Sequence, residues 1–557
     1  MDETDAVHPT AGPGAAGLAP ETGHDQEHRS AARLVRSAGV VGVATMSSRA
    51  LGLARDLVLA HLFGAGNAMD AFTVAFRIPN LLRDLFAEGA MSAAFVPTFT
   101  RVLTAEGKAA AWRLGNLVIT ALLLATGALA LAGIVFARPL VNLVAGHFAS
   151  VPGKLDLAVA LARIMLPFLT LVAVAAGLMG MLNSLRRFFV PALSPAMFNV
   201  GTLATMAVLI PVCRAEGVRP IFAVAVGTLV GGVGQVLIQW PGLHRAGFRF
   251  RPLVDWRDAG LREVLTLMGP GMLSLAAVQV NNLVNTMLAT TQGEGAVSCL
   301  SFAFRVMYLP IGIFGVSIAT AAIPALSLDA ARGDTQGMRA TFSHSLRMML
   351  VLNVPAAVGL IVLSAPIVAL LFRHGSFSAQ AAAGTAAALA LYAPGLIGYS
   401  IVKLAVPTFY TLRDSRTPVA IGAATMAFNI VSSLTLVRLL SFPGLALSTA
   451  VSSLFNAALL LWLLERKLGG IDGRRVAVAI VKSAAAAAVM AVAAWGAGRW
   501  LDAAWPGQST AARLAHVAGG MGAGVAALVA AAHALRIAEF HEAVAAVRAR
   551  LLGRKAS

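Results

Sequence analysis

Charged residues and cysteines are both scarce in this sequence. Of its 557 residues, 12% are charged and 58% are hydrophobic, and the mean hydropathy is +0.79. About a quarter of the residues in a typical soluble domain are charged, so this composition excludes an ordinary soluble protein. The two cysteines, Cys213 and Cys299, offer neither a disulfide framework nor metal-ligand spacing. We interpret both as packing residues in or beside apolar segments.

Motifs of familiar enzyme chemistry are also missing. The sequence has no Walker-type phosphate loop, no HExxH zinc motif and no GxSxG nucleophile elbow. We therefore expect no metal and no cofactor. The net charge of +18 would suit nucleic acid, but the placement of the basic residues does not, so no nucleic-acid partner is expected. Residues 1–33 are polar and lack the apolar core of a cleavable signal peptide, which predicts a disordered tail.

Apolar runs of 20 or more residues recur along the whole chain. Each is long enough to cross a hydrocarbon core of about 30 Å as a helix, and a helix satisfies its own backbone hydrogen bonds in lipid. The sequence therefore predicts an all-α polytopic membrane protein with about fourteen transmembrane helices. The expected spans are 38–63, 69–100, 114–136, 156–178, 192–213, 220–240, 264–290, 296–325, 346–372, 380–407, 417–437, 444–464, 476–498 and 512–535.

Basic residues outside the expected spans gather on one side. Of the 43 lysines and arginines, 27 lie in one set of connections together with both tails, eight lie in the opposite set and eight lie within spans. The positive-inside rule places the richer side in the cytoplasm. Both termini are therefore expected to be cytoplasmic, which agrees with an even number of spans.

The chain repeats itself at an offset of 227 positions. The proline pairs that share this offset are Pro97/Pro324, Pro139/Pro366, Pro167/Pro394 and Pro191/Pro418. Such matches, in register with the spans, predict two pseudo-symmetric six-helix lobes in a parallel repeat, as in alternating-access transporters. The expected organisation is a disordered cytoplasmic tail (1–33), an N-terminal lobe (34–242), an amphipathic cytoplasmic connector (243–263), a C-terminal lobe (264–467), two extra helices (468–535) and a basic amphipathic cytoplasmic tail (536–557).

Charge within the expected spans marks the candidate site. A charge at the bilayer centre costs about 2.5 to 3.5 kcal/mol on insertion scales, and such residues mark functional sites. Arginines outnumber the local acids, which indicates an anionic ligand, and the planar guanidinium favours phosphate. The candidate substrate-binding residues are Arg49, Arg55, Arg83 and Arg305. The candidate cavity or gating acids are Asp56, Asp70 and Glu88, and Arg77 and Lys403 are expected to be structural or accessory.

The first two spans contain a specific block of motifs. The block includes Ser48-Arg49-Ala50-Leu51-Gly52-Leu53-Ala54-Arg55-Asp56, Phe63-Gly64-Ala65-Gly66 and Pro79-Asn80-Leu81-Leu82-Arg83, and later matches include Pro394-Gly395-Leu396 and Pro407-Thr408-Phe409-Tyr410. These residues resemble the MurJ (MviN) family of lipid II flippases, in the multidrug/oligosaccharidyl-lipid/polysaccharide exporter superfamily. The resemblance covers about residues 38 to 535, all the expected spans.

The resemblance implies a V-shaped carrier of two lobes in the bacterial cytoplasmic membrane. Such a carrier moves lipid II, the undecaprenyl-pyrophosphate-linked peptidoglycan precursor, from the inner to the outer leaflet. The family's cavity arginines fall on Arg49, Arg55, Arg83 and Arg305, and its cavity acids fall on Asp56 and Asp70. The last two helices would line a groove for the polyprenyl tail. Membrane lipids and the cell-wall synthesis machinery are the further partners implied.

The sequence departs from many family members around Arg305. Those members have an acid just before this arginine and another three residues after it, where this chain has Phe304 and Tyr308. Some members also bind sodium through an acid in the second lobe, and the interiors of the seventh to twelfth expected spans contain no Asp or Glu. The membrane potential is therefore the candidate driving force.

Two other functions stay open on the sequence. A related exporter would carry another polyprenyl-linked oligosaccharide or small cationic drugs, and a drug exporter is expected to have net acid in its cavity. A membrane enzyme that processes polyprenyl phosphates would need acidic or histidine residues in sizeable loops at the membrane edge. The largest connection, 241–263, is short and basic and is expected to lie on the anionic inner leaflet.

Overall fold

A computed structural model describes residues 23–84, 91–505 and 509–551 of the chain. All regular elements in these ranges are helices, which confirms the expected all-α class. The elements are α1 (Gly23–Phe63), α2 (Asn67–Arg83), α3 (Met91–Ala105), α4 (Lys108–Val135), α5 (Ala137–Ala145), the 3₁₀ turn η2 (Gly146–Ser150), α6 (Lys154–Met165), α7 (Phe168–Ser184), α8 (Phe189–Ala215), α9 (Ile221–Arg245), α10 (Ala259–Thr290), α11 (Ala296–Pro310), the π turn η3 (Ile311–Gly315), α12 (Val316–Arg332), α13 (Thr335–Val362), α14 (Ser364–Phe372), α15 (Ala379–Tyr392), α16 (Gly395–Thr411), α17 (Arg416–Leu440), α18 (Phe442–Leu468), α19 (Gly473–Ala504), α20 (Thr510–Ala534) and α21 (Ala538–Leu551).

Ten helical segments of the described chain are long and apolar enough to cross a membrane. The pair α15 and α16, bent by 46° at its break, would make an eleventh span. Eleven of the fourteen expected spans fall on these segments. The other three fall on α1, on α2 with α3, and on α10, which are helical but are not among these segments. The count of fourteen therefore stays a prediction.

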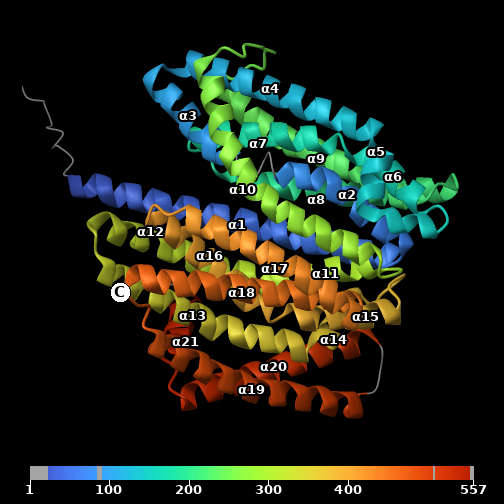
Figure 1. Ribbon diagram of the computed structural model, residues 1–557, viewed down its shortest axis with the longest axis vertical. Coiled ribbons are helices and arrows are strands. Elements are labelled where there is room, and N and C mark those ends of the chain that lie inside the picture. The colour runs from blue at the N-terminus through green and yellow to red at the C-terminus, as the bar shows by residue number, and fades with distance from the viewer. Residues whose placement is uncertain (1–22, 85–90, 506–508, 552–557) are drawn as a thin grey trace, which may run out of the picture.

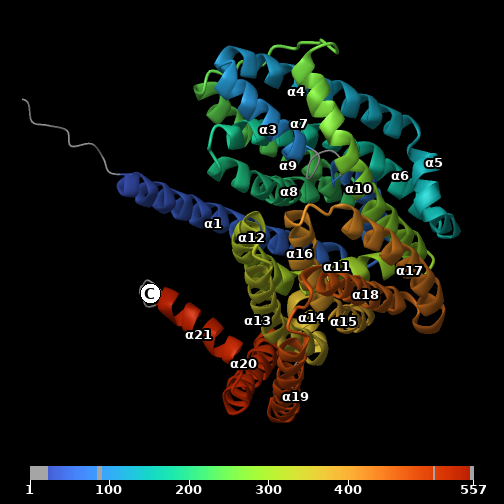
Figure 2. The same ribbon diagram turned by 60° about the vertical axis from the view of Figure 1, so that its left-hand side comes forward.

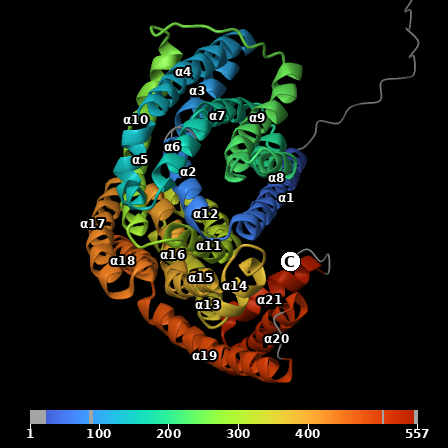
Figure 3. The ribbon, with the colours of Figure 1, turned by 90° about the vertical axis from the view of Figure 1, so that its right-hand side faces the viewer.

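The helices gather into two bundles with α1 and α10 between them (Figure 1). Helices α3 to α9 form one bundle, and α11 to α18 form the other. Helix α1 packs against α8, and α10 packs against both α3 and α17. Figure 3 shows α19 and α20 along the outer edge of the second bundle, where they pack beside α13. This arrangement places α1, α2, α10 and α11 where the bundles meet.

Helix boundaries recur at the offset found in the sequence. Helices α4 and α13 both have 28 residues and begin 227 positions apart, and α7 and α16 both have 17 residues at the same offset. Pro167 and Pro394 stand at the N-caps of α7 and α16, where a residue without a backbone N–H interrupts the preceding helix. Arg186 and Arg413, which follow these two helices, share the left-handed backbone conformation with φ of 58° and 57°.

The first helix begins earlier than the sequence predicts. Helix α1 starts at Gly23, so residues 23–33 of the expected disordered tail are helical, and residues 1–22 lie outside the described ranges. Residues 24–38 contain neither proline nor glycine, so nothing in the backbone ends the helix there. Figure 2 shows this part of α1 extending beyond both bundles. Its polar composition gives no hydrophobic period from which a helix could be predicted.

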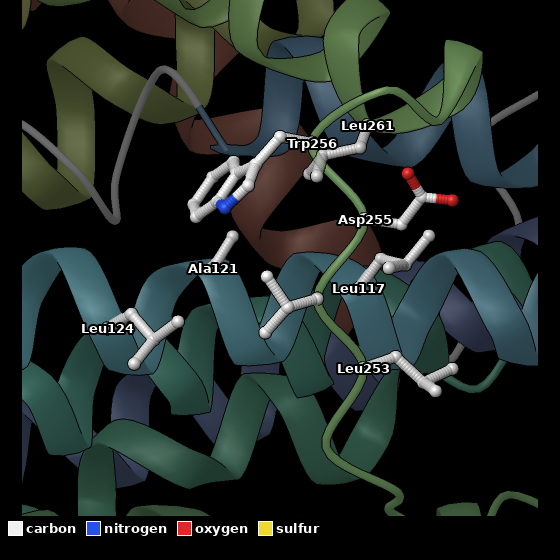
Figure 4. Close-up of a pocket in the computed structure, with 8 residues that line it drawn as sticks. Leu117, Ala121, Leu124, Leu253, Asp255, Trp256 and Leu261 are labelled. Atoms are coloured by element: carbon white, nitrogen blue, oxygen red, sulfur yellow. The ribbon is translucent and has the colours of Figure 1, made fainter.

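The connection between α9 and α10 is an extended strap on the surface of α4. The side-chain amide of Asn116 donates to Arg249 O at 3.1 Å and accepts from Arg251 N at 2.9 Å, as a neighbouring β-strand would. Figure 4 shows Leu253 and Trp256 of the strap lying over the leucines of α4. These contacts fasten the expected connector to the first bundle.

Candidate functional site

Asp56 of α1 lies between two arginines, one on the same helix and one on α11 of the second bundle. Arg55, its neighbour on α1, donates from Nε and Nη2 to Asp56 Oδ1 at 3.2 and 3.0 Å. Arg305 of α11 forms an ion pair with the same oxygen. The Asp56 side chain is 8% exposed, and the Arg55 guanidinium lies 5.1 Å from the ring centroid of Phe198 on α8. Two cations thus share one buried carboxylate, and the group keeps an excess positive charge.

Arg49 makes a second contact between α1 and the second bundle. It lies seven residues before Asp56, about 10 Å along the same face of the helix. Its guanidinium occupies the space over Gly312, where an added Cβ would collide with Nη1. Gly312 belongs to the π turn η3 and lies seven residues after Arg305. The two antiparallel helices therefore face each other at two points with equal spacing, and π turns are frequent at functional sites.

Arg83 belongs to a separate polar group at the end of α2. It donates from Nη2 and Nε to Asp84 Oδ1 at 2.6 and 3.1 Å. The other oxygen of Asp84 accepts from Gln279 of α10 at 3.0 Å and from Asn80 at 3.5 Å. The group connects α2 to α10. Glu88, the third expected acid, lies outside the described residues.

Asp70 pairs with a lysine and not with the expected cavity arginines. It is fully buried in the first turn of α2, and its Oδ2 accepts from Lys154 Nζ at 3.0 Å and from Gly295 N at 2.8 Å. Its Oδ1 accepts from the backbone N–H and the hydroxyl of Ser298 at 3.0 and 2.7 Å. The carboxylate therefore caps the N-terminus of α11, where unpaired N–H groups and the helix dipole favour an anion. Asp70 fastens α2 to the opposite bundle.

Three glycines bring the backbones of the two bundles into contact beside Asp70. Each has a positive φ: 62° at Gly64, 79° at Gly295 and 60° at Gly375. An added Cβ would collide at Gly64 with Ser376 O, at Gly295 with Ala65 O and at Gly375 with His61 O. Ser376 N also donates to His61 O at 2.9 Å. This glycine seal closes the interface at the end where α1 stops and α11 starts.

The two expected accessory residues lie apart from these groups. Arg77 is partly buried in α2, and its Nε is a buried atom for which the described residues provide no hydrogen-bond partner. Lys403 is exposed on α16, and within the described ranges no ion pair involves it. The structure therefore brings together Arg55, Asp56 and Arg305, with Arg49 two turns away.

Sequence reasoning missed three partners of the acids, namely Lys154, Ser298 and Gln279. Each is 84 or more positions from its acid in the chain, so the pairing depends on how the bundles pack. One signal was present for Ser298, which lies 228 positions after Asp70. Equivalent positions of a twofold repeat meet where they lie on its axis, so the repeat itself points to this contact.

Comparison with known proteins decides the family. The family model described as "Lipid II flippase MurJ" matches residues 59–515. The chain belongs to the MurJ family. A lipid II flippase MurJ from Burkholderia cenocepacia is 36% identical over 440 residues, which are 78% of this chain and 84% of the relative. A probable lipid II flippase MurJ from Rhizobium meliloti is 35% identical over 476 residues, which are 84% and 87% of the two chains.

Solved structures show the same fold. A structure titled "Lipid II flippase MurJ, inward closed conformation" matches with a TM-score of 0.72 and 23% identity, over 89% of this chain and 99% of that chain. An inward-facing multidrug resistance MATE family transporter of the MOP superfamily matches with a TM-score of 0.65 and 15% identity, over 77% and 98%. The MurJ family match spans Asp70, Arg83 and Arg305, whereas Arg49, Arg55 and Asp56 precede its first residue.

Proposed function

We propose that the chain is a lipid II flippase that works by alternating access in the bacterial cytoplasmic membrane. The observation that carries the proposal is the carboxylate of Asp56 on α1, which is shared by Arg55 of the same helix and Arg305 of the second bundle. Excess positive charge where the two bundles meet suits a pyrophosphate, because each guanidinium can bind phosphate oxygens in a bidentate way. The names of the curated relatives supply lipid II as the substrate.

In the proposed cycle, the carboxylate of Asp56 pairs with the arginines while no substrate anion is bound. The pyrophosphate enters from the cytoplasmic side and takes Arg305 away from Asp56, with Arg49, Arg55 and Arg83 as its further ligands. This exchange weakens one bridge between the bundles while the substrate forms another. The bundles then rock apart at the glycine seal, the site opens outward and the lipid leaves into the outer leaflet.

The proposal includes the finer architecture expected from the sequence. It has fourteen transmembrane helices in two six-helix lobes, 34–242 and 264–467, with two extra helices at 468–535. Both termini, the connector 243–263 and the tail 536–557 are cytoplasmic. The repeated helix boundaries and the sidedness of the basic residues support this arrangement.

The alternative functions fit the same residues less well. A cation exporter needs net negative charge at its site, whereas Arg55, Asp56 and Arg305 sum to a positive charge. An enzyme that processes polyprenyl phosphates needs acids or histidines at the membrane edge, whereas the strap 246–258 presents mainly arginines and apolar side chains, and its Asp255 pairs with Arg113 at 3.1 Å. Contacts with the cell-wall synthesis machinery are part of the proposal for the cellular role.

Complementation of a flippase-depleted bacterium tests the proposal. The Arg55→Ala, Arg83→Ala and Arg305→Ala variants should insert normally, fail to support growth and leave the lipid-linked precursor in the inner leaflet. Arg305→Lys should restore growth poorly, because lysine cannot bind phosphate in a bidentate way. The matched control is Arg138→Ala. Arg138 forms an exposed ion pair with Asp156 away from the site, so this variant should support normal growth. Normal growth of all three alanine variants would overturn the proposal.

A further inference from the structure

Three of the four tyrosines of this chain lie together beside Arg305. Tyr308 of α11, Tyr392 of α15 and Tyr399 of α16 surround Phe304, with ring centroids 5.8, 5.5 and 6.1 Å from its ring. Tyr308 stacks on Phe304 with an interplanar angle of 28°, and the other two rings meet it edge to face at 74° and 78°. A residue type that is rare in the chain is thus concentrated at one position in the fold.

The cluster lies on the face of α11 that meets α1. Tyr308 follows Arg305 by three residues and precedes Gly312 by four, so the three positions are neighbours on one helix face. Arg305 reaches Asp56 at one end of this face, and Arg49 lies over Gly312 at the other end. Tyr308 therefore stands between the two points at which arginines bridge the bundles.

Two of the phenol groups are available to a ligand. Tyr392 is buried, whereas Tyr308 and Tyr399 are half-buried at the edge of the core. Among the residues that the structure describes, none forms a hydrogen bond with the hydroxyl of Tyr308 or Tyr399. Tyrosine combines an apolar ring with a polar end that takes a hydrogen-bond partner where it is enclosed. Rings and hydroxyls together are suited to a partner that has both an apolar face and polar groups.

We propose that Phe304, Tyr308 and Tyr399 form the wall that binds the sugar next to the pyrophosphate of the substrate. This inference rests on the proposed flippase function. A pyranose ring has a C–H face that packs on aromatic rings, and its hydroxyl and acetamido groups bond to phenols. Arg305 binds the pyrophosphate, and Tyr308, one helical turn away, meets the sugar attached to it.

The charges around the wall disfavour charged ligands. Aromatic rings also attract cations through their faces, but Arg305, Arg55 and Arg49 make this region positive. The negative ring faces likewise repel a second anion. A neutral group satisfies both conditions, and the phenol hydroxyls of Tyr308 and Tyr399 favour a neutral group that has hydroxyls of its own.

Binding to two purified lipids tests the wall with the full-length protein in lipid nanodiscs. The probes are undecaprenyl pyrophosphate with a GlcNAc–MurNAc disaccharide whose lactyl carboxyl is amide-linked to the stem peptide, and bare undecaprenyl pyrophosphate. The Tyr308→Phe and Tyr399→Phe variants remove one hydroxyl each and keep the rings. Each should weaken binding of the sugar-bearing lipid about three- to tenfold, as expected for one lost hydrogen bond, and leave the Kd of the bare lipid unchanged.

Control variants separate the wall from the rest of the site. Tyr410→Phe changes the fourth tyrosine, which is 51% exposed near the end of α16, and should alter neither Kd. Arg305→Ala should weaken both lipids. An equal loss for both lipids in the Tyr→Phe variants, or no loss for either, would overturn the wall while leaving the flippase proposal in place. Wild-type protein that binds neither lipid would instead overturn the proposed function itself.

Discussion

At the scale of single residues, the site depends on a carboxylate that two guanidinium groups share. The arginines and Asp56 could be predicted from the sequence, because charge among apolar residues is costly and therefore conspicuous. Their pairing could not, because Arg305 is about 250 positions from Asp56 and meets it only when the bundles pack. Many family members have acids at the positions of Phe304 and Tyr308, so Arg305 has no acidic neighbour in the sequence here. In the structure Arg305 pairs instead with Asp56 of α1.

Asp56→Asn is expected to lower the stability of the protein by about 3 to 5 kcal/mol, as does removal of one partner of a buried ion pair. The amide keeps the shape of the side chain but leaves Arg55 and Arg305 facing each other without an anion. Thermal unfolding in detergent measures the change. Asp156→Asn is the matched control, because its pair with Arg138 is exposed and should contribute less than about 1 kcal/mol. Equal effects of both substitutions would contradict the prediction.

Gly312→Ala is expected to displace the guanidinium of Arg49 and to impair growth in the complementation assay. The added Cβ meets only the far end of a flexible side chain, so the fold should persist. Any loss of melting temperature should disappear in the Arg49→Ala background, since the two positions are in contact and their effects are not additive. Gly422→Ala serves as control, because nothing lies within 4 Å of its added Cβ. Additive losses in the double variant would refute the contact.

At the scale of helices, hydropathy predicted most spans but not all their ends. Long apolar segments such as α4 and α9 are readily predicted from hydropathy. Helix α1 has a polar start and internal arginines, and both lower its mean hydropathy. The breaks at Pro167 and Pro394 follow from proline chemistry, and their equal spacing reflects the repeat. The left-handed turn at Arg413 has no such signal, because arginine rarely adopts a positive φ.

The turn between α16 and α17 is held by Asp414, and Asp414→Asn should destabilise it by about 1 kcal/mol, as for a lost helix cap. Hydrogen bonds from Lys467 and Thr417 hold the pKa of Asp414 well below its usual range. A carboxyl with a lowered pKa stabilises the fold fully above the ordinary value of about 3.9, and this contribution falls as the pH drops further toward the folded-state pKa. Melting temperatures of both proteins, compared from pH 7 to pH 3, should therefore differ by a constant amount down to about pH 4 and only begin to converge below that pH.

The matched control for this turn is Asp472→Asn, whose carboxylate is 47% exposed and lies 3.7 Å from Arg475. Its melting curve should follow that of the wild type over the whole range, because exposed pairs contribute little. A difference between Asp414→Asn and wild type that grows as the pH is lowered would show that the sign of the linkage is wrong.

At the scale of the whole molecule, the two bundles meet at equivalent positions of the repeat. Asn67 N donates to Glu294 at 3.2 Å, 227 positions away, and Asp70 meets Ser298, 228 positions away. Contacts between equivalent residues are expected where a pseudo-twofold axis passes through a structure. Rocking about such an axis would change these contacts together, so the proposed outward opening involves the Asp70 group and the glycine seal at once.

A thiol at Ala54, introduced after replacement of Cys213 and Cys299, should react with a membrane-impermeant reagent only in outward-open molecules. Ala54 is half-buried in α1 beside Arg55. Collapse of the membrane potential should change the labelled fraction, because moving one charge across 100 mV changes the free energy by about 2.3 kcal/mol. A thiol at Ala149, exposed in η2 at the proposed outer surface, should react under all conditions. An active Ala54→Cys variant that never reacts from outside would refute the rocking cycle.

The glycine seal offers a way to set the ratio of the two proposed states without touching the arginines. Its contacts run between backbone atoms, so neighbouring side chains cannot tighten or loosen them by small steps. A methyl group at Gly64, Gly295 or Gly375 would collide with the opposite backbone only in the sealed state, in addition to the strain of its positive φ, and each 1.4 kcal/mol of this collision penalty would move the population tenfold toward the open state. Graded combinations of alanines at these positions would then form a series of proteins with the same binding residues and different resting populations, from which the cost of opening could be measured directly.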